Sequence, residues 1–344
     1  MKPIFDKKDF SLCEVPVPKG YPQSQTHTGV GQLGDIIVLT KSPYPSVKRN
    51  VVVSYLRAAI GKLFNYQKFK KPGEFYENPC IYIGKKKGND FPTEFKLAQE
   101  RPLEESLEPV FGMPSFNSDP DLYIEGETVY VLNRSIYRRS NKKFDYFMRL
   151  FLFEGRIVNE KFLLYNKSLF KEGTDIVGSQ CLCKYKDKYI LTDVVSNSYN
   201  DGETFSGIRM LKGETMQELS SSNTWEYVTV DRGQYLPWHM SLFIYDNRLY
   251  TIIACVEDGK PQRCWQLLGV FSEDLSKLKI YQTPLTDYSS YRGSAIVDKD
   301  GEFIIYNTTV REKIKGSKSV DGRDVIMAHM PMNDLITKLE SENQ

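Results

Sequence analysis

Stretches in which apolar and polar residues alternate, broken by short turns, run through most of the chain and predict paired β-strands. Five such pairs have the form of a hairpin. They span residues 29–42, 123–134, 182–195, 242–256 and 295–310. Their turns contain Asp, Asn and Gly, as at Asp300-Gly301, because these residues tolerate the backbone angles of tight turns. Helical periodicity is confined to residues 51–64, which also fit a strand followed by a helix, and to residues 332–342.

The five hairpins recur along the chain at similar intervals. We aligned them on the apolar or aromatic residue that opens the second strand and counted back 11 residues, or 10 in the first hairpin. This count gives five anchor positions, namely His27, Asp119, Gly178, His239 and Arg292, at intervals of 92, 59, 61 and 53 residues. A second recurring phrase, at residues 219–230 and 270–281, predicts an outer strand pair. Units of this kind, repeated radially, are typical of β-propellers.

The sequence therefore predicts an all-β fold, a five-bladed β-propeller with four-stranded antiparallel blades in a single domain of residues 1–344. The blades are expected at about 20–112, 113–172, 173–232, 233–286 and 287–330, followed by a short C-terminal helix. The extra length of the first blade predicts an insertion at about 45–75. A β-sandwich is the rival architecture, but it does not explain the spacing. Because inner strands line the channel of a propeller, the anchors should converge there.

Composition narrows the functional classes. Of the 344 residues, 40% are hydrophobic and 26% are charged, which is typical of a folded protein. A net charge of +2 lacks the basic excess of a protein that neutralises many phosphates, so we expect no nucleic acid partner. No apolar run approaches the roughly 20 residues of a membrane span, and charges at the N-terminus argue against a signal peptide. We therefore expect synthesis in the cytoplasm and no membrane partner.

Two resemblances suggest a ligand. The phrase Ser118-Asp119-Pro120-Asp121, with the hairpin that follows it, resembles the aspartate-proline opening of blades in five-bladed glycoside hydrolases, the arabinanase and β-xylosidase family with its invertase-like relatives. This resemblance implies a polysaccharide or oligosaccharide bound at the channel. Four short phrases, at 28–31, 42–45, 77–79 and 237–239, resemble those of propeller proteins from bacteriophage virions and their host-glycan-handling components. This second resemblance implies association with a virion and with other virion proteins.

Catalysis by glycoside hydrolases normally needs two carboxyl groups that flank the scissile bond. Of the five anchors only Asp119 carries one, and the resemblance implies that it acts as base or electrostatic stabiliser. His239 could then be the acid, a role it resembles having in neoagarobiose hydrolases of similar fold, or it could bind a hydroxyl group. Alternatively, a second carboxylate could come from a loop. The candidates are Glu77, Asp121, Asp175, Asp201 and Glu203, of which Glu77 and Asp121 are also expected to bind the substrate.

Other residues are candidates for binding the sugar. His27 and Arg292 would fix it, although Arg292 could instead pair with Asp119 and neutralise the channel. Trp238 and Tyr235 could stack on a sugar ring or pack in the core. Six scattered cysteines and three histidines indicate buried thiols rather than disulfides or a zinc site, so no cofactor or metal is assigned. A calcium ion in the channel, as in some relatives, would need oxygen ligands that strand phase does not identify.

A non-catalytic propeller is the alternative. Such a protein would recognise glycans or form part of a phage virion or tail, and the missing carboxylates favour it. It predicts binding of a saccharide without any product.

Overall fold

The computed structural model describes most of the chain, namely residues 2–19, 21, 25–43, 77–104, 111, 115–140, 145–174, 179–196, 205–257, 260–310, 314–318 and 323–342. Nearly all regular structure in these ranges is β-strand. The expected insertion at about 45–75 and its helix-like segment 51–64 lie outside the described residues, as do Gly178, Asp175, Asp201 and Glu203.

Four-stranded antiparallel runs are the repeating unit of the fold. The first two sheets are β2 (Gln25–Leu33), β3 (Ile36–Pro43), β4 (Cys80–Lys85) and β5 (Lys96–Leu97), and then β6 (Ser115–Glu125), β7 (Thr128–Arg138), β8 (Tyr146–Val158) and β9 (Lys161–Gly173). In each sheet the strands follow one another in chain order. This order is what consecutive hairpins produce.

Two further runs are joined into one eight-stranded sheet. They are β10 (Cys181–Tyr185), β11 (Lys188–Ser196), β12 (Phe205–Gly213) and β13 (Glu226–Asp231), and then β14 (Tyr235–Tyr245), β15 (Arg248–Glu257), β16 (Lys260–Phe271) and β17 (Lys277–Ile280). The only contact between the two runs in the ladder is a parallel pairing of β13 with β17, the last strand of each, within the described ranges. Each run is otherwise antiparallel.

The last sheet combines the two ends of the chain. It contains β18 (Ser290–Val297), β19 (Glu302–Thr309) and β20 (Val325–Pro331), and β1 (Ser11–Cys13) pairs with the outer side of β20. A short 3-10 helix, η1 (Lys7–Asp9), precedes β1, and α3 (Met332–Glu342) follows β20. Helix α3 confirms the predicted C-terminal helix, and it buries Leu335 and Leu339.

The five predicted hairpins are confirmed as β2–β3, β6–β7, β10–β11, β14–β15 and β18–β19. The strand pair expected at 270–281 is also confirmed, as β16–β17. The prediction for 219–230 is wrong, because this segment begins inside the helix α2 (Met216–Ser221) and only β13 is a strand. The hydroxyl of Thr215 accepts a hydrogen bond from the Glu218 N–H and starts this helix, whose Leu219 is buried.

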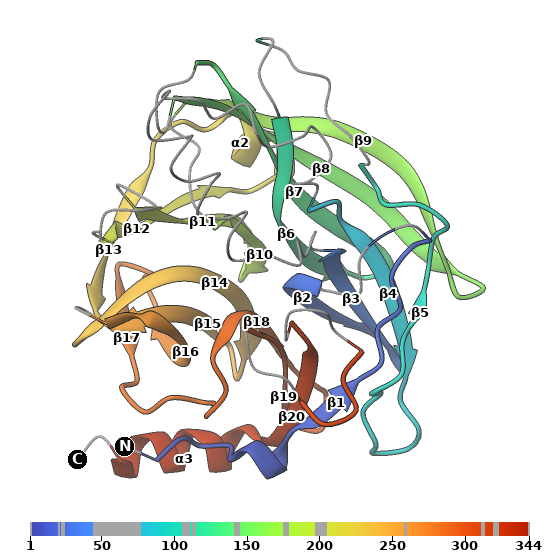
Figure 1. The fold of residues 1–344 in the computed structure, drawn as a ribbon. Helices are drawn as coiled ribbons and strands as arrows, with labels where there is room; N and C mark the ends of the chain where they lie inside the picture. Colours follow the sequence, from blue (N-terminus) through green and yellow to red (C-terminus); the bar gives the residue numbers. More distant parts are fainter. Residues whose placement is uncertain are drawn as a thin grey trace, which may run out of the picture.

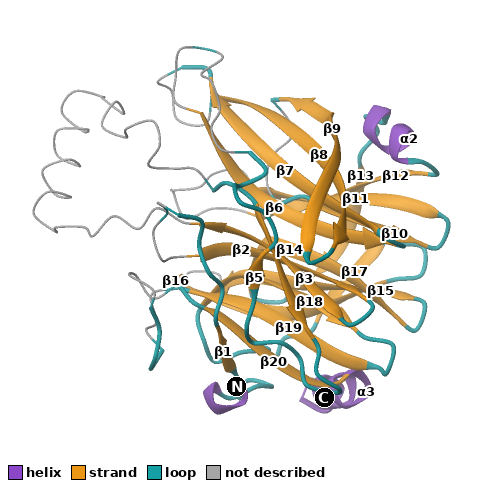
Figure 2. Ribbon diagram, turned by 90° about the vertical axis from the view of Figure 1, so that its right-hand side faces the viewer, coloured by secondary structure: helices purple, strands orange, loops and turns teal. Residues whose placement is uncertain are grey.

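The sheets surround a common centre, which is the arrangement of a β-propeller (Figure 1). The inner strands contact one another in a closed cycle, β2 with β6, β6 with β10, β10 with β14, β14 with β18 and β18 with β2. Viewed from the side, α2 and α3 lie at the periphery (Figure 2). No helix among the described residues is long and apolar enough to cross a membrane.

Apolar side chains from neighbouring sheets fill the space between them. Val38 of β3, for example, belongs to one buried cluster with Leu122 of β6 and Val131 of β7. Leu39, the next residue of β3, points the other way into a cluster with Tyr306 of β19. Residues that alternate along β3 therefore pack against neighbouring sheets on both faces of their own sheet. Polar residues of the inner strands lie instead at the centre of the molecule.

Candidate functional site

A β-bulge interrupts four of the inner strands close to their first residues. The pairing register shifts between Thr26 and Gly29 in β2 and between Ser118 and Asp121 in β6. Similar shifts occur between Pro237 and His239 in β14 and between Ser290 and Gly293 in β18. A bulge releases residues from the ladder and re-aims their side chains, which is common beside active sites.

The bulges bring one position of each hairpin to the centre. His27, Asp119, His239 and Tyr291 each lie six residues before the last paired residue of the first strand, which is Leu33, Glu125, Tyr245 and Val297 respectively. The same count from Tyr185 gives Ser179 in the third hairpin. Three anchors counted from the sequence, His27, Asp119 and His239, therefore occupy equivalent places in the ladder.

The remaining two anchors are displaced by one residue. In the last hairpin Tyr291 takes the place assigned to Arg292, because the segment 298–302 between the paired residues Val297 and Phe303 is longer than the other turns. In the third hairpin the position belongs to Ser179, whereas the anchor Gly178 lies outside the described residues. Counting along the sequence detects neither the longer turn of the last hairpin nor that Tyr189 is the second paired residue after its turn, where Tyr130 and Tyr250 are the third.

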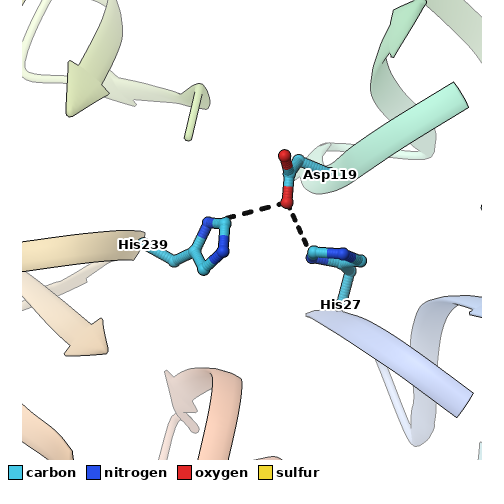
Figure 3. A group of neighbouring side chains, drawn as sticks. All are labelled: His27, Asp119 and His239. Atoms are coloured by element: carbon cyan, nitrogen blue, oxygen red, sulfur yellow. Dashed lines mark ion pairs between the residues drawn. The ribbon is translucent and has the colours of Figure 1, made fainter. Parts of the chain in front are cut away.

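His27, Asp119 and His239 meet at the centre of the molecule, each from a different sheet (Figure 3). His27 Nδ1 lies 2.7 Å from Asp119 Oδ1, and His239 Nδ1 lies 3.5 Å from the same oxygen. All three side chains are 1% exposed. His27 and Asp119 also have left-handed φ values of 51° and 53°, which are uncommon for residues with a β-carbon and typical of strained functional positions.

The close approach of β2 to β6 makes this meeting possible. Gly29 follows His27 by two residues, and a β-carbon built on it would lie 3.0 Å from the backbone nitrogen of Leu122. Only glycine permits this contact without moving the neighbouring strand. The sequence Thr28-Gly29 thus brings the bulge of β2 against that of β6.

A second layer of side chains holds the cluster. Glu77 Oε2 lies 2.7 Å from His27 Nε2, on the side of the ring away from Asp119. The other oxygen of Asp119, Oδ2, forms an ion pair with Arg134 and lies 2.9 Å from Ser118 Oγ. Consequently Oδ1 faces the two histidines and Oδ2 is held by Arg134 and Ser118.

Burial and neighbouring charges shift the pKa values of the two histidines of the cluster in opposite directions. Burial favours the neutral form of Asp119, but the charges of His27 and Arg134 outweigh it and hold the pKa of this carboxyl well below its usual range. Burial also lowers the pKa of His27, yet the carboxylates of Glu77 and Asp119 raise it above its ordinary value overall. Burial keeps the pKa of His239 well below its ordinary value, so this imidazole is neutral at pH 7.

Partly exposed side chains surround the buried cluster. The ring of Tyr291 lies edge-on to both imidazoles, with centroids 5.0 Å from His27 and 4.9 Å from His239. The ring of Trp238 lies 6.1 Å from that of His239. Together with Glu77, whose side chain is 15% exposed, these aromatic residues form the accessible edge of the site, which we call the rim.

Three predicted site residues lie in the interior instead. Arg292 and Asp121 form a buried ion pair, with Nη2 3.1 Å from Oδ1, and Asp121 also accepts a hydrogen bond from the Leu182 N–H. Burial raises the pKa of Asp121 to about 6, against the opposing charge of Arg292. Tyr235 is 3% exposed and packs in a hydrophobic cluster with residues such as Met240. None of these three side chains offers an accessible surface for a sugar.

The structure also identifies residues that the sequence analysis missed. Arg134, rather than Arg292, neutralises Asp119. Its signal in the sequence was present, because pairing the β6–β7 hairpin from its turn, Glu125 with Thr128, places Arg134 opposite Asp119, and the bulge then shifts it opposite Ser118. Tyr291 was missed for the reason of turn length given above.

Comparisons with known proteins bear on the fold. No protein-family model matches the chain, and no curated protein matches it either. Among solved structures, it is similar to an N-acetylgalactosamine deacetylase from F. plautii in complex with blood group B trisaccharide, at 15% identity and a TM-score of 0.58, covering 92% of this chain and 94% of that one.

Two further structures are similar. One is a xylan β-1,4-xylosidase from Bacillus halodurans, at 12% identity and a TM-score of 0.57, covering 91% of this chain and 54% of that one. The other is an α-L-arabinofuranosidase from Fusarium graminearum, at 10% identity and a TM-score of 0.52, covering 90% and 78%. At these identities the likeness establishes a shared fold and says nothing about activity.

Proposed function

We propose that the chain is a five-bladed β-propeller that binds a polysaccharide or oligosaccharide at the rim of its central site and hydrolyses it. The count of five rests on treating β10–β13 and β14–β17 as separate blades, since only the parallel β13–β17 pairing joins them. The proposal of a saccharide rests on one observation above all. Partly exposed aromatic rings lie directly beside a buried group of titratable side chains.

Both parts of this arrangement suit a carbohydrate. Trp238 and Tyr291 are both partly exposed, and each ring combines apolar surface with a polar atom at its edge, which matches the mixed character of a sugar. His239 is neutral and 1% exposed, and neither of its ring nitrogens makes a hydrogen bond within the described part of the chain, so a hydroxyl group that reached beneath the rim would find a partner there. The similar structures support this class of ligand, because they include a xylosidase, an arabinofuranosidase and a deacetylase with a bound trisaccharide.

In this proposal Asp119 and His239 are the groups that turnover requires, and Glu77 is the second carboxylate. Ser118 Oγ lies 2.9 Å from Asp119 Oδ2 and 3.3 Å from Glu77 Oε2, so the two carboxyl groups are close together. Glu77 reaches the rim, whereas Asp119 acts from beneath it.

A non-catalytic saccharide-binding protein is the second candidate. The observation that favours it is the burial of Asp119, whose Oδ2 is already engaged by Arg134. The equivalent positions His27, Ser179, His239 and Tyr291 add no carboxylate. Association with a virion and its proteins stays a prediction from the sequence, as does synthesis in the cytoplasm.

Release of reducing ends from a panel of bacterial and plant polysaccharides separates the candidates. We expect release by the wild type, its loss in Asp119→Asn and His239→Ala, and its retention in Asp193→Asn. The last variant is a matched control, because Asp193 is a buried carboxylate that pairs with Arg209 away from the cluster. Thermal unfolding of each variant checks that it is folded.

Binding measured by calorimetry on the same panel completes the test. Trp238→Ala should weaken binding about tenfold, or about 1.4 kcal/mol, because it removes a stacking surface while His27, Asp119 and His239 all remain. Binding without release would support the non-catalytic candidate. Neither binding nor release with any saccharide would contradict the proposal as a whole.

A further inference from the structure

Three potential metal ligands converge at the centre of the molecule. They are His27 Nδ1, Asp119 Oδ1 and His239 Nδ1, and ligand atoms of these three residues all lie within 4.8 Å of one another. The residues come from the bulges of β2, β6 and β14, so the backbone distortions that assemble the cluster also aim its three side chains at one point (Figure 3). Each is 1% exposed.

None of these three atoms makes a hydrogen bond of good geometry within the described ranges, although His27 Nδ1 and Asp119 Oδ1 lie close together. Buried polar atoms without such bonds cost free energy, and native structures rarely contain several of them side by side. A single cation bound between the three would satisfy all of them at once. Without a cation, the ion pair between His27 and Asp119 offsets part of that cost, whereas His239 Nδ1 has no hydrogen-bond partner within the described ranges.

Two of the three ligands, His27 and Asp119, are held from their far side by other residues, as the ligands of metal sites commonly are. Glu77 Oε2 lies 2.7 Å from His27 Nε2, which directs the opposite nitrogen Nδ1 towards Asp119. Ligand histidines in metalloproteins commonly donate their other ring N–H to a carboxylate in this way. Arg134 and Ser118 hold Asp119 by Oδ2 and leave Oδ1 available.

We propose that His27, Asp119 and His239 form a binding site for a divalent transition-metal ion, with Zn²⁺ the best fit. Two imidazoles and one carboxylate are ligands that zinc and similar ions prefer, whereas calcium and magnesium prefer oxygen ligands alone. Ligand atoms around a tetrahedral zinc ion lie about 3.3 Å apart, given bonds of about 2.0–2.1 Å. The observed separations of 2.7 and 3.5 Å are close to that value.

Three protein ligands leave a coordination position for a further molecule, as in catalytic rather than structural zinc sites. The half-exposed Tyr291 lies against both histidine rings, and Glu77 contacts one of them, so the rim is the side from which that molecule would come. The metal site does not depend on the proposed saccharide function. Its test therefore measures the metal and needs no substrate.

Metal binding by the purified full chain tests this inference. After treatment with a chelator and its removal, we expect the wild type to bind one equivalent of Zn²⁺ in competition with a chromophoric chelator. Co²⁺ in place of Zn²⁺ should give the visible absorption of a site with nitrogen and oxygen ligands. His27→Ala and His239→Ala should lose both signals.

His329→Ala is the matched control. His329 is the third histidine of the chain, it is exposed, and its Nδ1 lies 2.7 Å from Glu302 Oε1, so it too is a histidine beside a carboxylate. This variant should bind Zn²⁺ as the wild type does. Glu77→Gln should bind one equivalent about 10–100-fold more weakly, because it removes a partner of a ligand but no ligand.

Several results would overturn the inference. These are a wild type that binds no stoichiometric Zn²⁺, a His239→Ala variant that binds it as tightly as the wild type, or a His329→Ala variant that loses it. If the alanine variants do not fold, Glu77→Gln decides, since unchanged affinity there would contradict the role of His27 as a ligand. Failure to release sugar would leave the metal result unaffected.

Discussion

At the level of single residues, the centre of the molecule depends on keeping Asp119 ionised in the interior. Its carboxylate is 1% exposed and contacts Arg134 on one oxygen and His27 on the other. Removal of one partner from a buried ion pair leaves the other charge uncompensated, which is far more costly than the loss of a surface pair. Arg134 is therefore expected to stabilise the fold as well as to orient the site.

Substitution Arg134→Met should lower the free energy of unfolding by about 3 kcal/mol, because the methionine fills part of the space but leaves Asp119 without its cation. Urea denaturation at pH 7 measures this loss. Arg209→Met, at the buried pair with Asp193, is the comparison and should be similarly destabilising. Only Arg134→Met should also reduce saccharide turnover or metal affinity. A fall of less than about 0.5 kcal/mol in the free energy of unfolding of Arg134→Met would contradict the importance of this ion pair.

Residue counting identified part of this centre and missed another part for definite reasons. His27, Asp119 and His239 share a phase that the repeat makes visible in the sequence. Tyr291 was missed because one turn is longer, and Arg134 because it lies on the second strand, where no anchor was sought. The importance of Glu77 was visible only as one of several loop carboxylates, since nothing in the sequence pairs it with His27.

At the level of elements, the first and last sheets are linked by a pair that joins a loop to a turn. Lys86, just after β4, lies with Nζ 2.7 Å from Asp298 Oδ2, which follows β18. Asp298 also accepts hydrogen bonds from the backbone N–H groups of Asp300 and Glu302, so it holds the turn of its own hairpin. Lys86 additionally lies over the ring of Phe91.

Substitution Asp298→Asn should destabilise the protein at pH 7 by about 1–3 kcal/mol. Burial alone would raise the pKa of Asp298, but the bonds from Lys86, Glu302 and Asp300 outweigh it and hold that pKa below its ordinary value. A carboxyl with a depressed pKa contributes stability above the ordinary pKa of about 3.9, and this contribution is lost as the pH falls through the folded-state value. The difference between wild type and variant should therefore shrink below about pH 4.

Urea denaturation across pH 3–8 measures this difference. Lys86→Met should reproduce most of the loss at pH 7, whereas Lys87→Met should not, because the neighbouring Lys87 is exposed. A gap between wild type and Asp298→Asn that is the same at pH 3.5 and pH 7 would show that the carboxylate charge is not responsible.

The elements themselves were predictable where alternation was strong. All five inner hairpins lie where the pattern placed them, because the apolar residues of their strands are buried against the neighbouring sheets on both faces. Outer elements were less predictable. Strand β5 has only two residues, and α2 was mistaken for a strand because its serine-rich end carries little helical signal while the cap at Thr215 lies before it.

At the level of the whole molecule, the N-terminal segment joins the last sheet to the first. Ser11, Leu12 and Cys13 add β1 to the outer edge of β20. The next residue, Glu14, exchanges backbone hydrogen bonds with the segment 93–95, which lies beside the first sheet. A circular arrangement of sheets must be closed somewhere, and here backbone pairing closes it between the last and first sheets in the sequence.

Deletion of residues 2–14 should therefore destabilise the protein strongly, although the segment is short. It would expose the edge of β20 and remove the buried side chains of Phe5 and Cys13, which together contribute roughly 3–5 kcal/mol. Because single domains are stable by only about 5–15 kcal/mol, we expect a large fall in the melting temperature and association through the open edge, measured by calorimetry and size-exclusion chromatography.

A synthetic peptide of residues 2–15, added in trans, should restore both the melting temperature and the monomeric state. Deletion of residues 333–342, which removes the apolar contacts of α3 but leaves the β1–β20 ladder intact, should also be destabilising and should not respond to the peptide. A shortened chain that stays monomeric with an unchanged melting temperature would mean that the contacts between sheets close the ring without β1.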